Sequence, residues 1–117
     1  MDVRLASFGA IEAEGQRYEH DIVVDHGVVR KRSKGPSKAY RGRFGHTPLS
    51  VDETLPWDTD RLIIGTGAYG SLPVMAEVSA EAEHRGIELI TVPTEEACRL
   101  ISSLDAADVC AVLHVTC

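Results

Sequence analysis

From residue 62 onward, apolar strand patterns alternate with amphipathic helix patterns, and this alternation restricts the possible folds more than any other feature. Leu62-Ile63-Ile64 is wholly apolar, which is typical of a strand covered on both faces. The predicted elements are a strand at 62–64, a helix between Pro73 and Gly86, a strand at 87–92, a helix with Thr94 as its N-cap and a strand at 109–116. Strands joined through helices pair in parallel by right-handed crossovers, so this half of the chain predicts a βαβαβ unit.

The first third of the chain carries the two-residue alternation of antiparallel strands. From Tyr18 to His26 every second residue falls on one face, residues 4–10 fit a preceding strand, and Val28 starts a further one. Gly15-Gln16 and His26-Gly27 are the expected turns. Antiparallel strands followed by βαβαβ predict a single α/β domain over all 117 residues, with three layers and a mixed central sheet.

Charge is distributed unevenly along the chain. Seven of the 12 Lys and Arg residues lie in one stretch without acids, namely Arg30, Lys31, Arg32, Lys34, Lys38, Arg41 and Arg43. Five basic residues against 18 acidic ones remain elsewhere, a net charge of −13. The stretch has no apolar periodicity, so residues 30–48 are predicted to form a flexible, solvated loop. We expect this loop to dock a protein partner or to hold a small anion, whereas the acidic remainder would repel a nucleic acid.

Composition excludes several classes of protein. No uncharged run approaches the roughly 18 apolar residues of a membrane span, and no signal peptide or mitochondrial presequence is recognisable, so no membrane association is expected. Cys98, Cys110 and Cys117 are too few and too scattered for a disulfide framework, which favours the reducing cytoplasm. Aromatic residues make up only 5% of the chain, which disfavours stacking on single-stranded nucleic acid.

A glycine-rich loop, Gly65-Thr66-Gly67-Ala68-Tyr69-Gly70, follows the first apolar strand with G-x-G-x-x-G spacing. In dinucleotide-binding enzymes such glycines bring backbone amides against a pyrophosphate at a helix N-terminus. Here Ser71-Leu72-Pro73 separates the loop from its helix, and no acid ends the strand at 87–92 to hold a ribose, so dinucleotide binding is disfavoured. We favour a tight turn that needs positive φ, and the alternative is a polar cleft in which the loop amides hold an anion.

The last strand ends in His114-Val115-Thr116-Cys117, which places two polar side chains on one face. His114 with Cys117 on the opposite face cannot complete a zinc site, so neither a metal nor a cofactor is predicted. A buried structural histidine is favoured over an acid–base role for His114. The candidate ligand-binding residues are Gly65, Thr66, Gly67, Gly70, His114 and Thr116.

No set of catalytic residues is recognisable, because the chain lacks a nucleophile elbow, a P-loop and an H-E-x-x-H motif. Asp21 and Asp25 are expected to be exposed rather than paired as a catalytic dyad. Ser50 and Glu53 have the spacing of a capping box at the start of a helical turn.

Several short motifs together resemble the small Mth-domain proteins, a family that includes an adipogenesis-associated protein and a mitochondrial factor for assembly of respiratory complex I. The matching motifs are Asp21-Ile22-Val23-Val24, Ile63-Ile64-Gly65-Thr66-Gly67, Arg85-Gly86-Ile87-Glu88, Pro93-Thr94 and Leu113-His114-Val115-Thr116-Cys117. The resemblance implies a three-layer α/β domain with a mixed sheet, and it implies no established activity.

The sequence therefore predicts a small non-catalytic domain for binding or assembly. Its polar cleft would comprise the Gly65–Gly70 loop, His114 and Thr116, and its docking arm would be Arg30–Arg43. The alternative is a protein that binds a small metabolite or anion, or a minor enzyme in which His114 is an acid or base.

Overall fold

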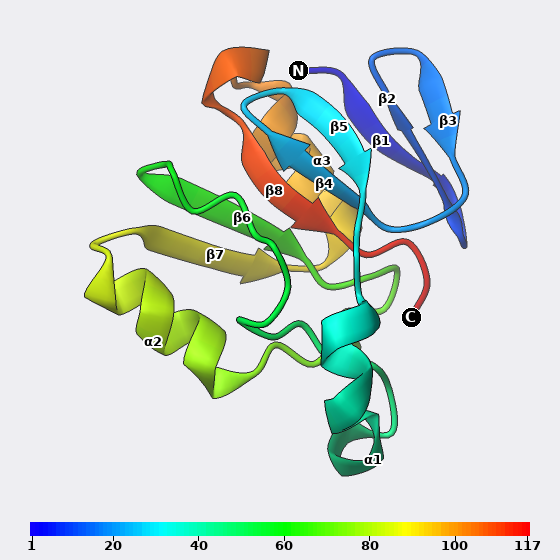
Figure 1. The fold of residues 1–117 in the computed structure, drawn as a ribbon. Helices are drawn as coiled ribbons and strands as arrows, with labels where there is room; N and C mark the ends of the chain where they lie inside the picture. The colour runs from blue at the N-terminus through cyan, green and yellow to red at the C-terminus, as the bar shows by residue number, and fades with distance from the viewer.

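The computed structural model describes residues 1–117, and a five-stranded mixed sheet lies at its centre (Figure 1). The strands are β4 (Ile22–Asp25), β5 (Val28–Lys31), β6 (Arg61–Gly65), β7 (Glu88–Val92) and β8 (Cys110–Leu113), in the spatial order β5-β4-β8-β6-β7. Strands β8, β6 and β7 run parallel, and β4 is antiparallel to both β8 and β5. The prediction of an α/β fold with a mixed central sheet is confirmed.

Helices and a second sheet cover the two faces of the central sheet. Helix α2 (Ala76–His84) packs on one face and helix α3 (Thr94–Ser102) on the other. On the α3 side lies an antiparallel sheet of β1 (Val3–Ser7), β2 (Ala10–Ala13) and β3 (Gln16–Tyr18). Because α2 and α3 connect the parallel strands, the βαβαβ unit and the three layers follow the prediction. No helix of the structure is long and apolar enough to cross a membrane.

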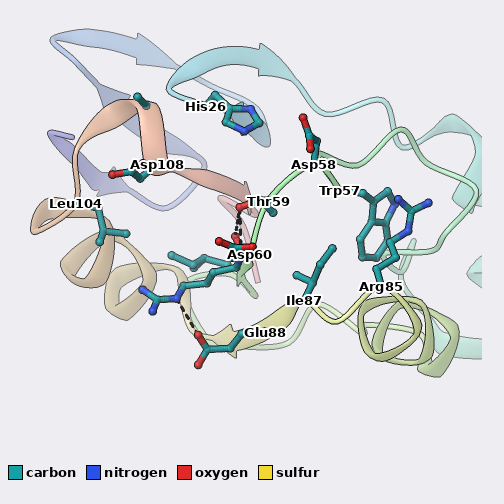
Figure 2. Close-up of a pocket in the computed structure, with 13 residues that line it drawn as sticks. His26, Trp57, Asp58, Thr59, Asp60, Arg85, Ile87, Glu88, Leu104 and Asp108 are labelled. Carbon is teal, nitrogen blue, oxygen red and sulfur yellow. Dashed lines mark hydrogen bonds and ion pairs between the residues drawn. The ribbon is translucent and has the colours of Figure 1, made fainter.

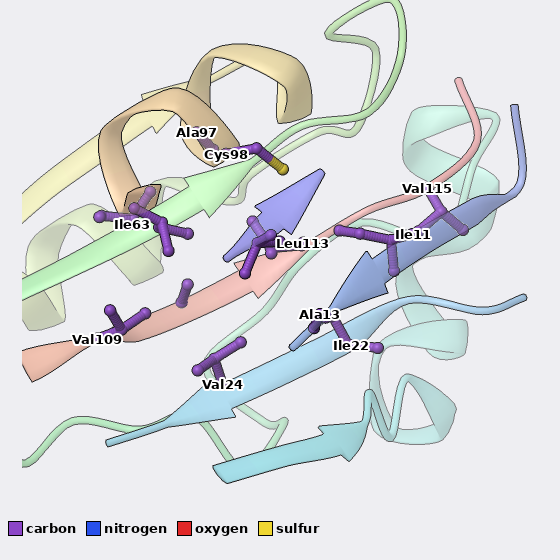
Figure 3. Packing of buried hydrophobic residues seen from close by; sticks show 13 residues of the cluster. Ile11, Ala13, Ile22, Val24, Ile63, Ala97, Cys98, Val109, Leu113 and Val115 are labelled. Carbon is purple, nitrogen blue, oxygen red and sulfur yellow. The ribbon is translucent and has the colours of Figure 1, made fainter. Parts of the chain in front are cut away.

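Two apolar clusters fill the spaces between the layers. Figure 3 shows the first, in which Ile11 of β2 gathers with Ile22, Val24 and Leu113 of the central sheet. The second lies between the other face and α2, and its buried members include Val23, Leu62, Ile64, Val78, Ala82 and Val112. Successive residues of β4 thus enter opposite clusters, which explains why the strand is apolar without interruption.

Residues 18–26 do not form the single strand that the alternation predicted. Strand β3 ends at Tyr18 in the small sheet, and β4 begins at Ile22 in the central sheet. The chain crosses between the sheets at this point, and Asp21 turns inward, where its carboxylate accepts three hydrogen bonds. The strand predicted at 4–10 is likewise divided between β1 and β2.

The basic segment is more ordered than the predicted loop. Its first residues belong to β5, and they are followed by a 3₁₀ helix, η1 (Gly35–Tyr40), and a single α-helical turn, α1 (Arg41–Phe44). Pro36 near the start of η1 and Gly45 with a φ of +73° after α1 are the residue types that begin and end such turns. A second 3₁₀ turn, η2 (Ala106–Asp108), precedes β8.

Arg32 shows that the prediction of a solvated loop is wrong for part of this segment, because the residue is only 4% exposed. Its guanidinium donates to both carboxylate oxygens of Glu53, each at 2.8 Å, and to Asp21 at 2.9 Å. It also donates to the carbonyl of Pro48, and Ser37 donates to Glu53. Glu53 thus serves as an ion-pair partner that ties the segment to the sheet, and the predicted capping box forms only a turn.

We expect Glu53→Gln to destabilise the protein by about 3–5 kcal/mol, because it leaves part of a buried guanidinium charge unpaired. The matched control is Glu88→Gln, since the Arg61–Glu88 pair at 2.9 Å is solvent-exposed and is expected to contribute about 0–1 kcal/mol. Urea denaturation of both variants measures the difference. Equal small losses would contradict the assigned role of Glu53.

Candidate functional site

A pocket of about 330 Å³, the basic pocket, opens at the carboxyl end of β8. His114 and Thr116, which follow the end of this strand, line one side. Lys34, just before η1, Lys38 within η1 and Arg41 at the start of α1 line the other. The remaining lining residues are Arg32, Gly45, His46, Thr47, Ser71, Leu72 and Cys117. This edge, where the parallel strands end, is where open α/β sheets usually bind ligands.

His114 is held in a fixed orientation by Asp21. The Nδ1 atom of His114 lies 2.7 Å from the Asp21 carboxylate, and its Nε2 atom lies 3.2 Å from the Thr116 hydroxyl. The same carboxylate accepts from the amide of Val115 and from Arg32, each at 2.9 Å. Because a carboxylate only accepts, Nδ1 carries a proton, and Nε2 accepts from the Thr116 hydroxyl on the side of the pocket.

Asp21 is partly buried rather than exposed as the sequence suggested, with 10% of its side chain accessible. Burial alone would raise the pKa of Asp21, but the hydrogen bond and charge of His114, the Val115 amide and Arg32 outweigh it and lower the pKa. The carboxylate therefore stays ionised and keeps both Arg32 and His114 in place.

The cations at the mouth of the basic pocket differ from Arg32 in having no acidic partner. Lys34, Lys38 and Arg41 are exposed and form no salt bridge. Arg32 at the base of the pocket is paired twice. The free positive charge thus lies at the entrance, in a protein whose formal net charge is −6. Of the predicted docking residues, Arg30, Lys31 and Arg43 lie outside the pocket lining.

The glycine-rich loop has no backbone donor free for an anion. Every backbone amide from Thr66 to Leu72 donates within the protein. The acceptors are the carbonyl oxygens of Val92, Thr116, Cys117, Gly67 and Thr66 and the hydroxyl of Thr94. Gly65, Thr66, Gly67 and Gly70 do not line the basic pocket, so the predicted cleft retains only its residues from the end of β8.

Gly67 is the position at which this loop requires glycine. Its φ is +108°, and a Cβ there would lie 2.4 Å from the carbonyl carbon of Cys117 and 2.6 Å from the oxygen of Thr116. The loop is therefore a tight turn with positive φ that packs against residues 116–117, as the favoured interpretation of the sequence held.

Thr94 fastens this turn to the neighbouring strand and does not cap α3 as predicted. Its hydroxyl accepts from the amide of Gly67 at 2.8 Å and donates to the carbonyl of His114 at 2.6 Å. The residue lies inside the helix, the N-cap is Pro93, and no side-chain cap is present. One buried hydroxyl thus connects the loop to His114, the residue that follows β8.

A second hollow, the acidic basin, lies at the opposite end of the parallel strands and has a volume of about 820 Å³ (Figure 2). Its acidic lining residues are Asp58, Asp60, Glu88 and Asp108. Its two arginines are engaged already, since Arg61 pairs with Glu88 at 2.9 Å and Arg85 lies 5.1 Å from the centroid of the Trp57 ring. No sequence motif pointed to this hollow.

The cysteines occupy three different environments, and all are free thiols. Cys98 lies in the core as predicted, and burial raises the pKa of its thiol to about 11, which keeps it protonated and unreactive near neutral pH. Cys110 is also buried, at 1% exposure. Cys117 is partly exposed and lines the basic pocket.

Sequence reasoning missed Asp21, Arg32 and Glu53 as supports of the site. They are widely separated in the chain and come together only in the fold. The sequence held one weak indication that Arg32 is buried. The residue lies in a polar run, yet it directly follows β5, which pairs with the buried strand β4. Basic residues in such a run are usually solvated, so this signal does not distinguish Arg32 from its neighbours.

The Asp21 network predicts how stability depends on pH. A lowered carboxyl pKa adds stability above the ordinary value of about 3.9, and this contribution is lost as the pH falls through the pKa of the folded state. We therefore expect Asp21→Asn to lower the Tm at neutral pH, with a difference from the wild type that narrows below about pH 4. Thermal scans across this range, with the exposed Asp105→Asn as control, measure it. A Tm difference between Asp21→Asn and the wild type that stays constant to low pH would contradict a stabilising role for the ionised Asp21 carboxylate.

The contact at Gly67 predicts a second pair of variants. Gly86 also has a positive φ, +69°, but nothing lies within 4 Å of the position where its Cβ would be. Gly86→Ala should therefore cost only the backbone strain of about 1–2 kcal/mol. Gly67→Ala adds a clash with the backbone, and we expect a loss of about 2–5 kcal/mol in urea denaturation. Equal losses in the two variants would show that residues 116–117 do not press on the loop.

Comparison with known proteins gives the chain a family. A family model described as "Protein of unknown function (DUF498/DUF598)" matches residues 3–114. The crystal structure of the conserved hypothetical protein PH1505 from Pyrococcus horikoshii OT3 has 32% sequence identity and a TM-score of 0.82, with 100% of each chain covered. A solved structure described as MT938 has 26% identity and a TM-score of 0.67 over 95% of this chain and 94% of its own. No curated protein matches the sequence. The chain belongs to the DUF498/DUF598 family, whose function is unknown.

Proposed function

We propose that this protein is a binding domain whose basic pocket takes a small ligand bearing a phosphate group. The observation that carries the proposal is that Lys34, Lys38 and Arg41, all without an acidic partner, surround the same pocket as His114 and Thr116. A volume of about 330 Å³ is suited to a small molecule. The lining includes only two hydrophobic residues among 12, which favours an anionic group over an apolar one.

Each lining group has a role that a phosphate would use. The two lysine ammonium groups and the guanidinium of Arg41 supply charge-assisted hydrogen bonds at the entrance. The Thr116 hydroxyl donates to Nε2 of His114, whose ring Asp21 orients, and by rotation it can donate to a phosphate oxygen instead. Arg32 is neutralised by two carboxylates, so it supports the pocket and does not supply free charge.

Acid–base chemistry at His114 is the second candidate function. The contacts Asp21–His114 at 2.7 Å and His114–Thr116 at 3.2 Å are the arrangement in which a histidine can take a proton from a hydroxyl. No backbone donor of the glycine-rich loop is free to stabilise a developing oxyanion, and for this reason binding is preferred over catalysis.

Docking of a protein partner by the basic segment remains a further alternative. Lys31, Arg43 and Arg30 lie outside the pocket lining and would be the residues available for it, whereas Arg32 is buried.

We also infer a closer relation to the Mth-domain proteins, because the sequence shares their short motifs. The three free thiols favour a reducing compartment such as the cytoplasm.

Titration with inorganic phosphate at constant ionic strength tests the proposal. We expect weak binding to the wild type, and binding about tenfold weaker in the Lys34→Gln/Lys38→Gln variant, because charge-assisted hydrogen bonds are lost. NMR chemical shifts of the His114 ring should move on titration. Isothermal calorimetry measures the affinity.

The control variant Lys31→Gln/Arg43→Gln removes the same charge from the same segment outside the pocket. It should bind phosphate as the wild type does. Equal weakening in both double variants would mean that phosphate responds to overall charge, and it would overturn the proposed pocket.

A further inference from the structure

At the end of β8 opposite to the basic pocket, three side chains of metal-ligand type converge. The carboxylate of Asp25, Nδ1 of His26 and the thiol sulfur of Cys110 all lie within 4.8 Å of one another. His26 Nδ1 lies 2.7 Å from Asp25 Oδ1 and 3.8 Å from the sulfur of Cys110. Nδ1 of His26 donates to the Asp25 carboxylate here, and the sulfur of Cys110 lies close by, so the three ligand atoms are within reach of one ion once that hydrogen bond is given up.

The fold fixes this convergence through strand register. Asp25 is the residue directly opposite Cys110 in the antiparallel pair of β4 and β8, so their side chains leave the same face of the sheet. His26 is the first central residue of the hairpin turn to β5, with a φ of +50°, and Gly27 follows with +84°. Two successive positive φ values define a type I′ turn, which folds the imidazole back over the strand pair.

The hairpin turn is also held against η2. A Cβ on Gly27 would lie 2.7 Å from the carbonyl oxygen of Ala106, and the Gly27 amide donates to the carbonyl of Val109 at 3.2 Å. The backbone that carries His26 is therefore anchored next to the start of β8. Convergence of the ligand atoms does not depend on a free loop.

We propose that Asp25, His26 and Cys110 form a binding site for a divalent cation of the zinc class. Imidazole, thiolate and carboxylate together are ligands of zinc and its neighbours and not of calcium or magnesium. Tetrahedral zinc with normal bond lengths places such atoms roughly 3.3–3.7 Å apart. The 3.8 Å separation of nitrogen and sulfur is near this range, and the exposed Asp25 carboxylate needs to move by about half an ångström.

The surroundings are favourable to a cation. Figure 2 shows the ring of His26 at the rim of the acidic basin, with Asp58 beside it. Cys110 is buried at 1% exposure, whereas His26 and Asp25 are about half exposed, so a bound ion would be anchored on one side and open to solvent on the other. A water molecule would complete the four ligands from the basin side. Binding releases the thiol proton of Cys110 to solvent and also requires Nδ1 of His26 to give up the proton that it donates to Asp25, so affinity should fall at acid pH.

Titration of the reduced protein with Co²⁺, a spectroscopic substitute for zinc, tests the site. We expect one equivalent to bind, with a sulfur-to-cobalt charge-transfer band in the near ultraviolet and visible bands typical of tetrahedral coordination. Cys110→Ala should abolish the charge-transfer band, whereas Cys117→Ala should retain it. A band that is absent from the wild type, or that follows Cys117, would overturn the proposal.

His26→Asn is the variant that keeps the test independent of folding. Asparagine followed by glycine is the favoured pair in a type I′ turn, so this variant should retain the hairpin while it loses the imidazole. We expect affinity for Zn²⁺ at least about tenfold weaker, and loss of the zinc-induced rise in Tm. The control His84→Asn alters an exposed histidine at the end of α2 and should bind as the wild type does. Unchanged zinc affinity in His26→Asn would refute the site.

Discussion

The burial of Arg32 between Asp21 and Glu53 is the interaction on which the rest of the site depends. A guanidinium at 4% exposure requires its charge and its donors to be satisfied, and both carboxylates together with the Pro48 carbonyl do so. These contacts fix the connection between β5 and β6 against the sheet. Through Asp21 they also fix His114, so one desolvated cation orders both walls of the basic pocket.

This arrangement explains where the clustered basic residues of the sequence lie in the structure. One of the seven clustered cations turns inward and is neutralised, and the remaining six have no acidic partner. Three of these six surround the basic pocket, while the acidic basin occupies the far end of the parallel strands. The two ends of the central sheet therefore carry opposite charge, although the sequence mixes both signs over most of its length.

The sequence pattern predicted those parts of the fold that depend on hydrophobic periodicity and on the handedness of strand connections. The apolar run at 62–64, the helix signals on either side of 87–92 and the parallel order of these strands were all predicted, because periodicity and crossover handedness suffice for them. The break at residues 19–21 was not, since alternation continues through it while the chain changes sheets.

Some residues of the candidate site were likewise predicted from the sequence, and others were not. His114 and Thr116 were predicted on one face of a strand at 109–116; β8 ends earlier, at Leu113, yet their side chains are in contact. The inward turn of Asp21 and Arg32 depends on tertiary partners that no sequence window contains. Free loop amides were only the alternative to the favoured tight turn, and the structure leaves none free, because residues 116–117 and other groups that only the folded chain brings there accept from them.

Strand β8 is the middle strand of the central sheet, and it links the two ends of the molecule within a few residues. Cys110 begins β8, and His114 and Thr116 follow its last residue, Leu113, so the length of the strand sets where they lie relative to Cys110. Insertion or deletion of a single residue within the strand would reverse the side of every residue beyond it. Cys110 and His114 could then no longer both keep their present neighbours, so this strand, whose side chains are all buried, cannot change in length without disturbing the residues at one of its ends.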